Sequence, residues 1–178
     1  AVHFSSPPRI DASLEEWQMD RFRIESVVFG KENHKGPNDL SGRAMVGWDE
    51  NNLYLGIRVL DQKYVQNAGG TNLFKGDSLD ILIDTDVSGD FYRAALNDDD
   101  FQLGISPGSP NPNQDAEAYL WFPKAVDGSR DQVDIAARSR GDGYVVEAAI
   151  PWSVFDVTPF NGQHFGFVFS ISDNDNAS

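Results

Sequence analysis

The chain has 178 residues, which is enough for one domain with a buried core and short for two. Its 28 acidic and 14 basic side chains give a formal net charge of −14, which argues against binding nucleic acid or an anionic membrane, because both require a positive surface. The absence of cysteine excludes disulfides, thiolate metal sites and cysteine nucleophiles.

No apolar run is long enough to cross a bilayer, and the first residues lack the basic and apolar pattern of a signal peptide. A secreted chain that has already been trimmed would look the same. Aromatic residues make up 12% of the chain beside 16 Gly and 9 Pro, a composition typical of an all-β fold with many turns.

The amino-terminal region is predicted to contain a short strand and a capped turn. Residues 2–4 alternate apolar and polar side chains, which predicts a first strand that stops before two prolines. Ser13 and Glu16 have capping-box spacing, which favours a helical turn over residues 10–17. We expect Trp17, on the apolar side of that turn, to be a buried plug rather than a binding residue.

Short strands separated by turn signals account for most of the remaining chain. Alternating apolar residues predict a strand around Tyr119 and Trp121 and further strands at 22–29, 43–48, 53–60, 78–84, 91–96, 100–105, 133–139, 144–150 and 165–171. A short helical turn is predicted at 151–155. This pattern predicts an all-β fold, a single domain over residues 1–178 built as an antiparallel two-sheet β-sandwich of jelly-roll type. Its core is predicted to contain Leu55, Ile57, Ile81, Ile83, Phe167 and Phe169.

The stretch 74–86 combines an aromatic, a strand and an acidic turn. Asp80 falls on the opposite face from the apolar residues of its strand, because side chains alternate along a strand. Gln102, on the next clear strand, is expected on the same face as Asp80. An acid on a strand beside an aromatic at the strand's mouth is typical of a site for a polar, flat-faced ligand, so Phe74 and Asp80 are candidate binding residues.

The turn after this strand begins like a calcium-binding loop. Asp84, Asp86 and Ser88 occupy positions one, three and five of an EF-hand pattern, and Gly89 stands at position six. Position twelve is not Glu, so acids from the next turn would complete the site. The predicted calcium ligands are Asp84, Asp86, Ser88, Asp90, Asp98, Asp99 and Asp100, with a second site near Asp173, Asn174 and Asp175. The alternative is an acidic hairpin whose Asp and Gly residues only form the turn.

Four segments, taken in order, resemble one protein family. They are Ile10-Asp11 with Leu14 and Trp17, Trp48-Asp49-Glu50-Asn51-Asn52-Leu53-Tyr54-Leu55, the run from Gly76 to Asp84, and the run from Gly143 to Trp152. Together they resemble the family 9 carbohydrate-binding modules and their wider relatives, the sugar-binding and haem-binding domains of the same sandwich class. The resemblance implies two antiparallel sheets, bound calcium, and a glycan slot in secreted glycoside hydrolases.

In that family the slot grips a sugar between two aromatics, and carboxylate, amide and Arg groups bond its hydroxyls. By the resemblance, the first aromatic falls on Phe74, where Trp is usual, and the carboxylate on Asp80, where Glu is usual. The Arg position falls on Gly104 and the amide on Ser170. The family's second aromatic is not in this chain, so Trp121 is the candidate for a second platform. The alternative is that Phe74 anchors its loop and Trp121 is a core or surface aromatic.

No pair or triad in the sequence selects a catalytic site, and the three histidines have no metal-ligand spacing. We therefore expect a non-catalytic module that binds an oligo- or polysaccharide. It would be a monomer attached to other domains of a secreted, cell-surface or periplasmic protein. Two alternatives stay open: a structural or docking module whose sugar slot has decayed, and a haem-binding domain with Met19 or Met45 as an axial ligand.

Overall fold

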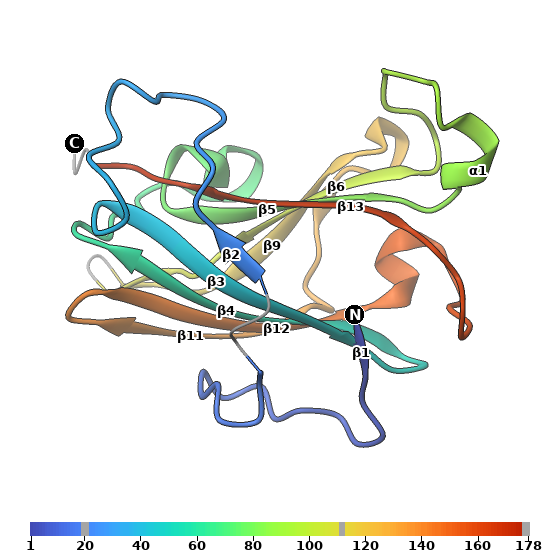
Figure 1. Ribbon diagram of the computed structural model, residues 1–178, viewed down its shortest axis with the longest axis horizontal. Coiled ribbons are helices and arrows are strands. Elements are labelled where there is room, and N and C mark those ends of the chain that lie inside the picture. The colour runs from blue at the N-terminus through green and yellow to red at the C-terminus, as the bar shows by residue number, and fades with distance from the viewer. Residues whose placement is uncertain (19–21, 111–112, 176–178) are drawn as a thin grey trace.

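The computed structural model describes residues 1–18, 22–110 and 113–175, which form two β-sheets packed face to face (Figure 1). The first sheet has the order β1-β3-β4-β12-β11, with β2 also paired to β3. Its strands are β1 (Val2–His3), β2 (Phe22–Ile24), β3 (Leu40–Trp48), β4 (Asn52–Asp61), β11 (Asp134–Arg140) and β12 (Gly143–Pro151). The second sheet has the order β10-β9-β6-β5-β13. Its strands are β5 (Ser78–Asp84), β6 (Asp100–Ser106), β9 (Glu117–Phe122), β10 (Gly128–Ser129) and β13 (Gly166–Ser172).

All the strand pairs between described residues are antiparallel except β1 with β3, where Val2 lies opposite Gly47. The predicted antiparallel sandwich is confirmed, with this one parallel contact at its edge. The remaining elements are short: the hairpin of β7 (Ser109–Pro110) and β8 (Asn113–Gln114), and the helical segments η1 (Gly70–Lys75), α1 (Val87–Asp90), η2 (Lys124–Val126) and η3 (Trp152–Phe155). None of the helices that the structure describes is long and apolar enough to span a membrane.

The main core lies between the inner faces of the two sheets. The core residues predicted on the two central strands are at most 2% exposed, and they are Leu55, Ile57, Ile81 and Ile83. Phe169 of β13 packs at the margin of this core. Phe167 lies opposite the buried Ile83 yet is 40% exposed, so its assignment to the core is wrong. The reason is that β13 is an edge strand with a neighbour on one side only.

Two predicted strands are shorter or absent. The predicted strand 91–96 is a turn after α1, and three of its apolar side chains, Phe91, Tyr92 and Leu96, are exposed. The strand predicted at 22–29 is reduced to β2. Residues 25–29 and 91–96 pair with no strand that the structure describes, and the local pattern cannot reveal such a lack of a partner.

The predicted helical turn at residues 10–17 is a single hydrogen-bonded turn, in which the backbone N–H of Trp17 donates to the carbonyl of Leu14 at 3.2 Å. The Glu16 carboxylate accepts from the backbone N–H of Arg9 at 3.1 Å. In a capping box, Glu16 would accept from the backbone N–H of Ser13 instead. The predicted turn is therefore in the right place, but it does not have the predicted helical capping.

A second, smaller core covers the outer face of the first sheet. Trp17 is 6% exposed and packs there with Met45 and Tyr54, as the plug prediction requires. The indole lies against Gly56 so closely that a Cβ at that position would come within 2.6 Å of the ring. The indole Nε1–H donates to Oε1 of Glu147 at 2.7 Å.

Glu147 fixes the amino-terminal segment to the sheet. It is 0% exposed on β12, and its Oε2 accepts from the backbone N–H groups of Asp11 at 2.9 Å and Ser13 at 3.2 Å. A buried carboxylate with three donors satisfies its own need for hydrogen bonds and that of its partners.

Replacing Glu147 by Ala leaves the Trp17 indole N–H and two backbone N–H groups without their acceptor. We expect the free energy of unfolding, measured by chemical denaturation, to fall by about 2–4 kcal/mol. The exposed Glu15→Ala change is the control and is expected to alter it by less than about 0.5 kcal/mol. A Glu147→Ala protein as stable as this control would contradict the anchoring role.

Candidate functional site

The outer face of the second sheet carries the predicted ligand-binding residues. The neighbours of Asp80 along β5, Leu79 and Ile81, are buried in the core, so Asp80 points outward. In the register of the sheet, Asp80 lies opposite Gly104 of β6 and Ser170 of β13. Residues directly opposite one another share a face, so these three positions form one row across the sheet.

Asp80 and Gln102 form a polar pair on this face. The side-chain amide of Gln102 donates to Oδ2 of Asp80 at 3.0 Å. Oδ1 of Asp80 is buried and has no hydrogen-bond partner among the described residues. Burial raises the pKa of Asp80, and the hydrogen bond from Gln102 lowers it. The pair therefore leaves one oxygen of the Asp80 carboxylate without a donor among the described residues.

Phe74 lies at the rim of the same face, on η1. It is 49% exposed, and its ring meets the indole of Trp121 edge-on, with 5.9 Å between the ring centroids and 75° between the planes. The amino group of Lys75 lies 6.0 Å from the centroid of the Phe74 ring. Phe74 thus presents a half-exposed ring that is supported by the indole of Trp121.

Trp121 occupies the space that a side chain at position 104 would need. A Cβ on Gly104 would lie 2.6 Å from Cζ3 of the Trp121 indole, and the indole N–H donates to the carbonyl of Thr71 at 3.0 Å. Trp121 is 8% exposed, so it offers only a small part of its ring to a ligand. Its use as a second stacking platform stays a prediction, and its visible contacts are those of a support for Phe74 and η1.

The acidic turn after β5 brings three predicted calcium ligands together. Carboxylate oxygens of Asp84, Asp90 and Asp99 all lie within 4.8 Å of one another, and we call them the α1 cluster. Oδ2 of Asp99 is buried and has no hydrogen-bond partner within the described ranges. Burial raises the pKa of Asp84, and the nearby carboxylates add to the increase against a hydrogen bond from the Asp86 N–H. The set offers hard oxygen ligands of the kind that Ca²⁺ prefers.

The other predicted ligands in this turn lie differently. Oδ1 of Asp86 accepts from the Ser88 hydroxyl at 3.0 Å and from the Gly89 N–H at 3.1 Å, which caps α1. Oδ2 of Asp100 accepts from the backbone N–H of Asn97 at 2.8 Å. Asp98 is exposed and lies outside the cluster. The turn thus forms a short helix where the EF-hand pattern predicts an open loop.

A second acidic cluster lies at the other end of β5. Asp61 ends β4, Asp77 precedes β5 and Asp173 follows β13, and their carboxylate oxygens also lie within 4.8 Å of one another. We call them the Asp77 cluster. Asp61 is 4% and Asp77 is 0% exposed, and Oδ2 of Asp61 is buried without a donor from any residue that the structure describes. At that separation each ionised pair repels by roughly 3 kcal/mol for an effective dielectric constant of about 20.

The electrostatics of the Asp77 cluster reflect this crowding. Burial, with the nearby carboxylates adding to it, raises the pKa of Asp77 to about 8 and that of Asp173 to about 6. Burial also raises the pKa of Asp61. Tyr144 is 1% exposed, and its hydroxyl has no hydrogen-bond partner in the described part of the chain. Burial raises the pKa of Tyr144, and the charges of Asp77 and Asp61 add to the increase. These groups fit a bound cation, which would supply the missing positive charge.

The sequence predicted a second site at residues 173–175, and only Asp173 belongs to the cluster. The backbone N–H of Asn174 donates to Oδ1 of Asp77 at 2.6 Å, and the carbonyl of Asp175 accepts from the Lys63 amino group. Asp61 and Asp77 were missed. Their signal was available, since each acid stands directly at the end of an apolar strand, but the pairing of those ends depends on the sheet order.

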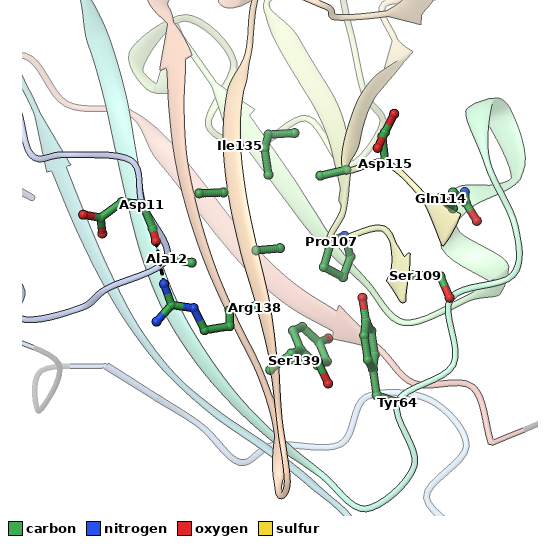
Figure 2. A pocket seen from close by; sticks show the side chains of 14 residues that line it. Asp11, Ala12, Tyr64, Pro107, Ser109, Gln114, Asp115, Ile135, Arg138 and Ser139 are labelled. Atoms are coloured by element: carbon green, nitrogen blue, oxygen red, sulfur yellow. Dashed lines mark hydrogen bonds between the residues drawn. The ribbon is translucent and has the colours of Figure 1, made fainter. Parts of the chain in front are cut away.

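A separate cleft of about 460 Å³ lies between β11 and the segment around β7 and β8 (Figure 2). Two of its polar side chains make hydrogen bonds: the Arg138 guanidinium donates to the backbone carbonyl of Asp11 at 3.2 Å, and the Tyr64 hydroxyl donates to the carbonyl of Gly108. The Tyr64 ring packs on Tyr144 with 4.7 Å between centroids. None of the predicted ligand-binding residues lines this cleft.

The two methionines considered as haem ligands are placed as follows. Met45 is 2% exposed inside the second core, in contact with the cluster of Trp17 and Tyr54. Met19 lies outside the described residues. Met45 thus fills a packing position rather than facing an open pocket.

Residues 10–178 match the family model described as "Carbohydrate family 9 binding domain-like". The chain belongs to the family 9 carbohydrate-binding modules. One curated relative is an endo-1,4-beta-xylanase A from Thermoanaerobacterium saccharolyticum, which is 26% identical over 79% of this chain and 10% of the relative. Another is the exoglucanase XynX from Acetivibrio thermocellus, which is 25% identical over 94% of this chain and 13% of the relative. The module spans about a tenth of the length of these relatives.

The fold agrees with that membership. A family 9 module from Caldicellulosiruptor kristjanssonii, solved in complex with cellotriose, matches with a TM-score of 0.60 and 20% identity over 99% of this chain and 77% of that one. The module is thus a non-catalytic carbohydrate-binding domain, because both enzymes match only over a region of module size.

Because Trp121 lies so close to Gly104, adding a single methyl group at position 104 is expected to lower the stability of the module. Gly104→Ala forces the indole to move, so we expect the free energy of unfolding to fall by about 1–3 kcal/mol. Gly141→Ala is the matched control, because a Cβ at Gly141 meets no atom within 4 Å. Equal stability of the two variants in denaturant titrations would show that Trp121 does not fill this space.

Proposed function

We propose that this module binds a glycan on the outer face of its second sheet, with a sugar ring stacked on Phe74 and hydroxyl groups donating to Asp80. The observation that carries the proposal is the unpartnered Oδ1 of Asp80 on the same sheet face as a half-exposed aromatic. Axial C–H groups give a sugar ring an apolar patch that suits stacking, and a carboxylate accepts two hydroxyl bonds at once. Gln102 orients the carboxylate and offers further amide contacts.

The glycan that we propose to test first is a β-1,4-linked glucan chain such as cellotriose. A solved relative holds cellotriose, and the curated relatives are named as a xylanase and an exoglucanase. We further propose that the module is one part of a longer, secreted glycoside hydrolase, as those names and the small share of their length suggest. Xylo-oligosaccharides are the second choice of ligand.

A docking module with a decayed sugar slot is the second candidate. It is favoured by the lack of a cationic side chain at position 104, where Trp121 fills the space, and by the small hydroxyl of Ser170 where an amide would be expected. Each lost hydrogen bond to a sugar hydroxyl makes binding less favourable by about 1 kcal/mol. Failure of every glycan in a broad panel to bind would favour this function.

We also propose that calcium stabilises the module through the α1 cluster. Asp84, Asp90 and Asp99 would hold the ion, and its charge would offset the repulsion among them. Asp86 and Ser88, which cap α1, would shape the turn around it.

Titration with cellotriose by calorimetry tests the glycan site. We expect Phe74→Ala and Asp80→Ala each to weaken binding at least tenfold, about 1.4 kcal/mol, because one removes the stacking face and the other the acceptor. Phe160→Ala is the control, since Phe160 is 64% exposed in the loop that precedes β13. Cellotriose binding that survives both changes would place the site elsewhere.

Thermal melting with and without calcium tests the α1 cluster. Calcium at a hundred times its dissociation constant adds about 2.7 kcal/mol to the free energy of unfolding. Asp90→Asn is expected to remove most of the shift attributable to this cluster, whereas Asp98→Asn, in the same turn but outside the cluster, should leave it intact. If the chelator leaves the melting temperature unchanged, the α1 cluster binds no stabilising calcium and is only an acidic turn.

A further inference from the structure

The Asp77 cluster is attached to the chain segment that carries Phe74. The backbone N–H of Asp77 donates to the carbonyl of Val65 at 3.0 Å, and Oδ2 of Asp77 accepts from the Val65 N–H. Oδ1 of Asp77 accepts from the N–H of Asn174, next to Asp173. The position of Asp77 therefore sets the start of the loop that follows β4 and the end of β13 together.

A buried amide carries this constraint to Phe74. The side chain of Gln66 is 2% exposed, and its Nε2 donates to the carbonyl of Leu73 at 3.1 Å and to that of Asp77 at 2.9 Å. These two carbonyls flank Phe74 on either side in the sequence. The backbone N–H of Gly76 also donates to the Leu73 carbonyl at 3.1 Å, which closes the turn. Phe74 thus stands on a turn clamped between Gln66 and Asp77.

The other half of η1 is held independently of the cluster. The backbone N–H of Gly70 donates to the carboxylate of Glu117 at 3.1 Å, and the Trp121 indole donates to Thr71. The hydrogen bonds that hold the Gly70 end of η1 on β9 thus do not involve the Asp77 cluster, whereas those that hold the Phe74 end lead to Asp77 through Gln66.

We propose that a divalent cation bound by Asp61, Asp77 and Asp173 fixes the turn that carries Phe74, so that cation binding and glycan binding strengthen each other. The inference rests on the proposed glycan site at Phe74. Among the described residues, Oδ2 of Asp61 and the hydroxyl of Tyr144 have no hydrogen-bond partner, although Asp61 is only 4% and Tyr144 only 1% exposed, and this points to a missing ligand. Three strand ends meet at this cluster, so an ion that draws the carboxylates together also holds the loop and the end of β13 in place.

The structure supplies an internal control. The α1 cluster has the same composition of three aspartates and stands at the opposite end of β5, beyond the hydrogen bonds that lead to Phe74. A cation there stabilises the module without touching the Gln66 clamp. Linkage requires that only the Asp77 cluster changes the affinity for the glycan, and that the glycan changes the affinity of that cluster for calcium by the same factor.

The experiment compares Asp173→Asn with Asp90→Asn in calcium and in chelator. Asp173 is exposed, so its replacement spares the core. Hydrogen exchange of amides 66–76 reads out the turn without any glycan, and calorimetry with cellotriose reads out binding. For the wild type, chelator should speed exchange in this segment and weaken cellotriose binding at least fivefold. In calcium, Asp173→Asn should reproduce both effects, and Asp90→Asn should reproduce neither.

The outcomes separate the two proposals. The proposed coupling is overturned if hydrogen exchange in residues 66–76 does not change with calcium. It is also overturned if Asp90→Asn and Asp173→Asn change that exchange equally. Both conclusions hold even where cellotriose binds. Exchange that depends on calcium and on Asp173, in a protein that binds no glycan, upholds the fixing of the turn by the cation and overturns the proposed function. If Asp173→Asn changes both the hydrogen exchange and the affinity for cellotriose, and Asp90→Asn changes neither, the proposed glycan site and the proposed coupling are both supported.

Discussion

Alternation along β5 is the constraint on which the site depends. The strand pairs with β6 on one side and β13 on the other, so its side chains must go either into the core or onto the outer face. Leu79, Ile81 and Ile83 take the core, and this leaves Asp80 on the outside with no choice of direction. The ends of the same strand bring Asp77 and Asp84 to two separate groups of acids. One strand therefore positions the proposed acceptor and both candidate cation sites.

Close packing explains why the glycan face departs from the pattern that the family resemblance implies. The position expected to hold Arg is Gly104, and the indole of Trp121 lies where that side chain would begin. Trp121 in turn supports Phe74 edge-on and holds η1 through Thr71. Where the resemblance implies a cationic hydrogen-bond donor, this face has the indole of Trp121, which packs against the half-exposed ring of Phe74. We expect such a face to bind weakly and to depend on how firmly Phe74 is held.

The sequence predicts what period-two patterns and strong turn signals determine: the sandwich, its four central core residues, the Trp17 plug, and the shared face of Asp80 and Gln102. It fails where the answer depends on neighbours in space. The pattern predicts Phe167 in the core, but it lies on an edge strand, and it predicts a strand at residues 91–96, which pair with no strand among the described residues. Asp61 and Asp77 are separated by sixteen positions, and only the order of strands in two sheets brings them to Asp173. Local spacing favoured an EF-hand loop, while Asp86 was already used to cap α1.

We propose that ligand recognition occurs on the outer face of the second sheet. Nuclear magnetic resonance of the isotopically labelled module during titration with cellotriose in calcium can locate the bound ligand. We expect the largest shifts on the backbone amides of Phe74 and Asp80, the side-chain amide of Gln102 and the indole N–H of Trp121, while the indole of Trp17 stays unchanged. Shifts concentrated instead on Tyr64, Arg138 and Ser139, around the cleft beside β11, would contradict it.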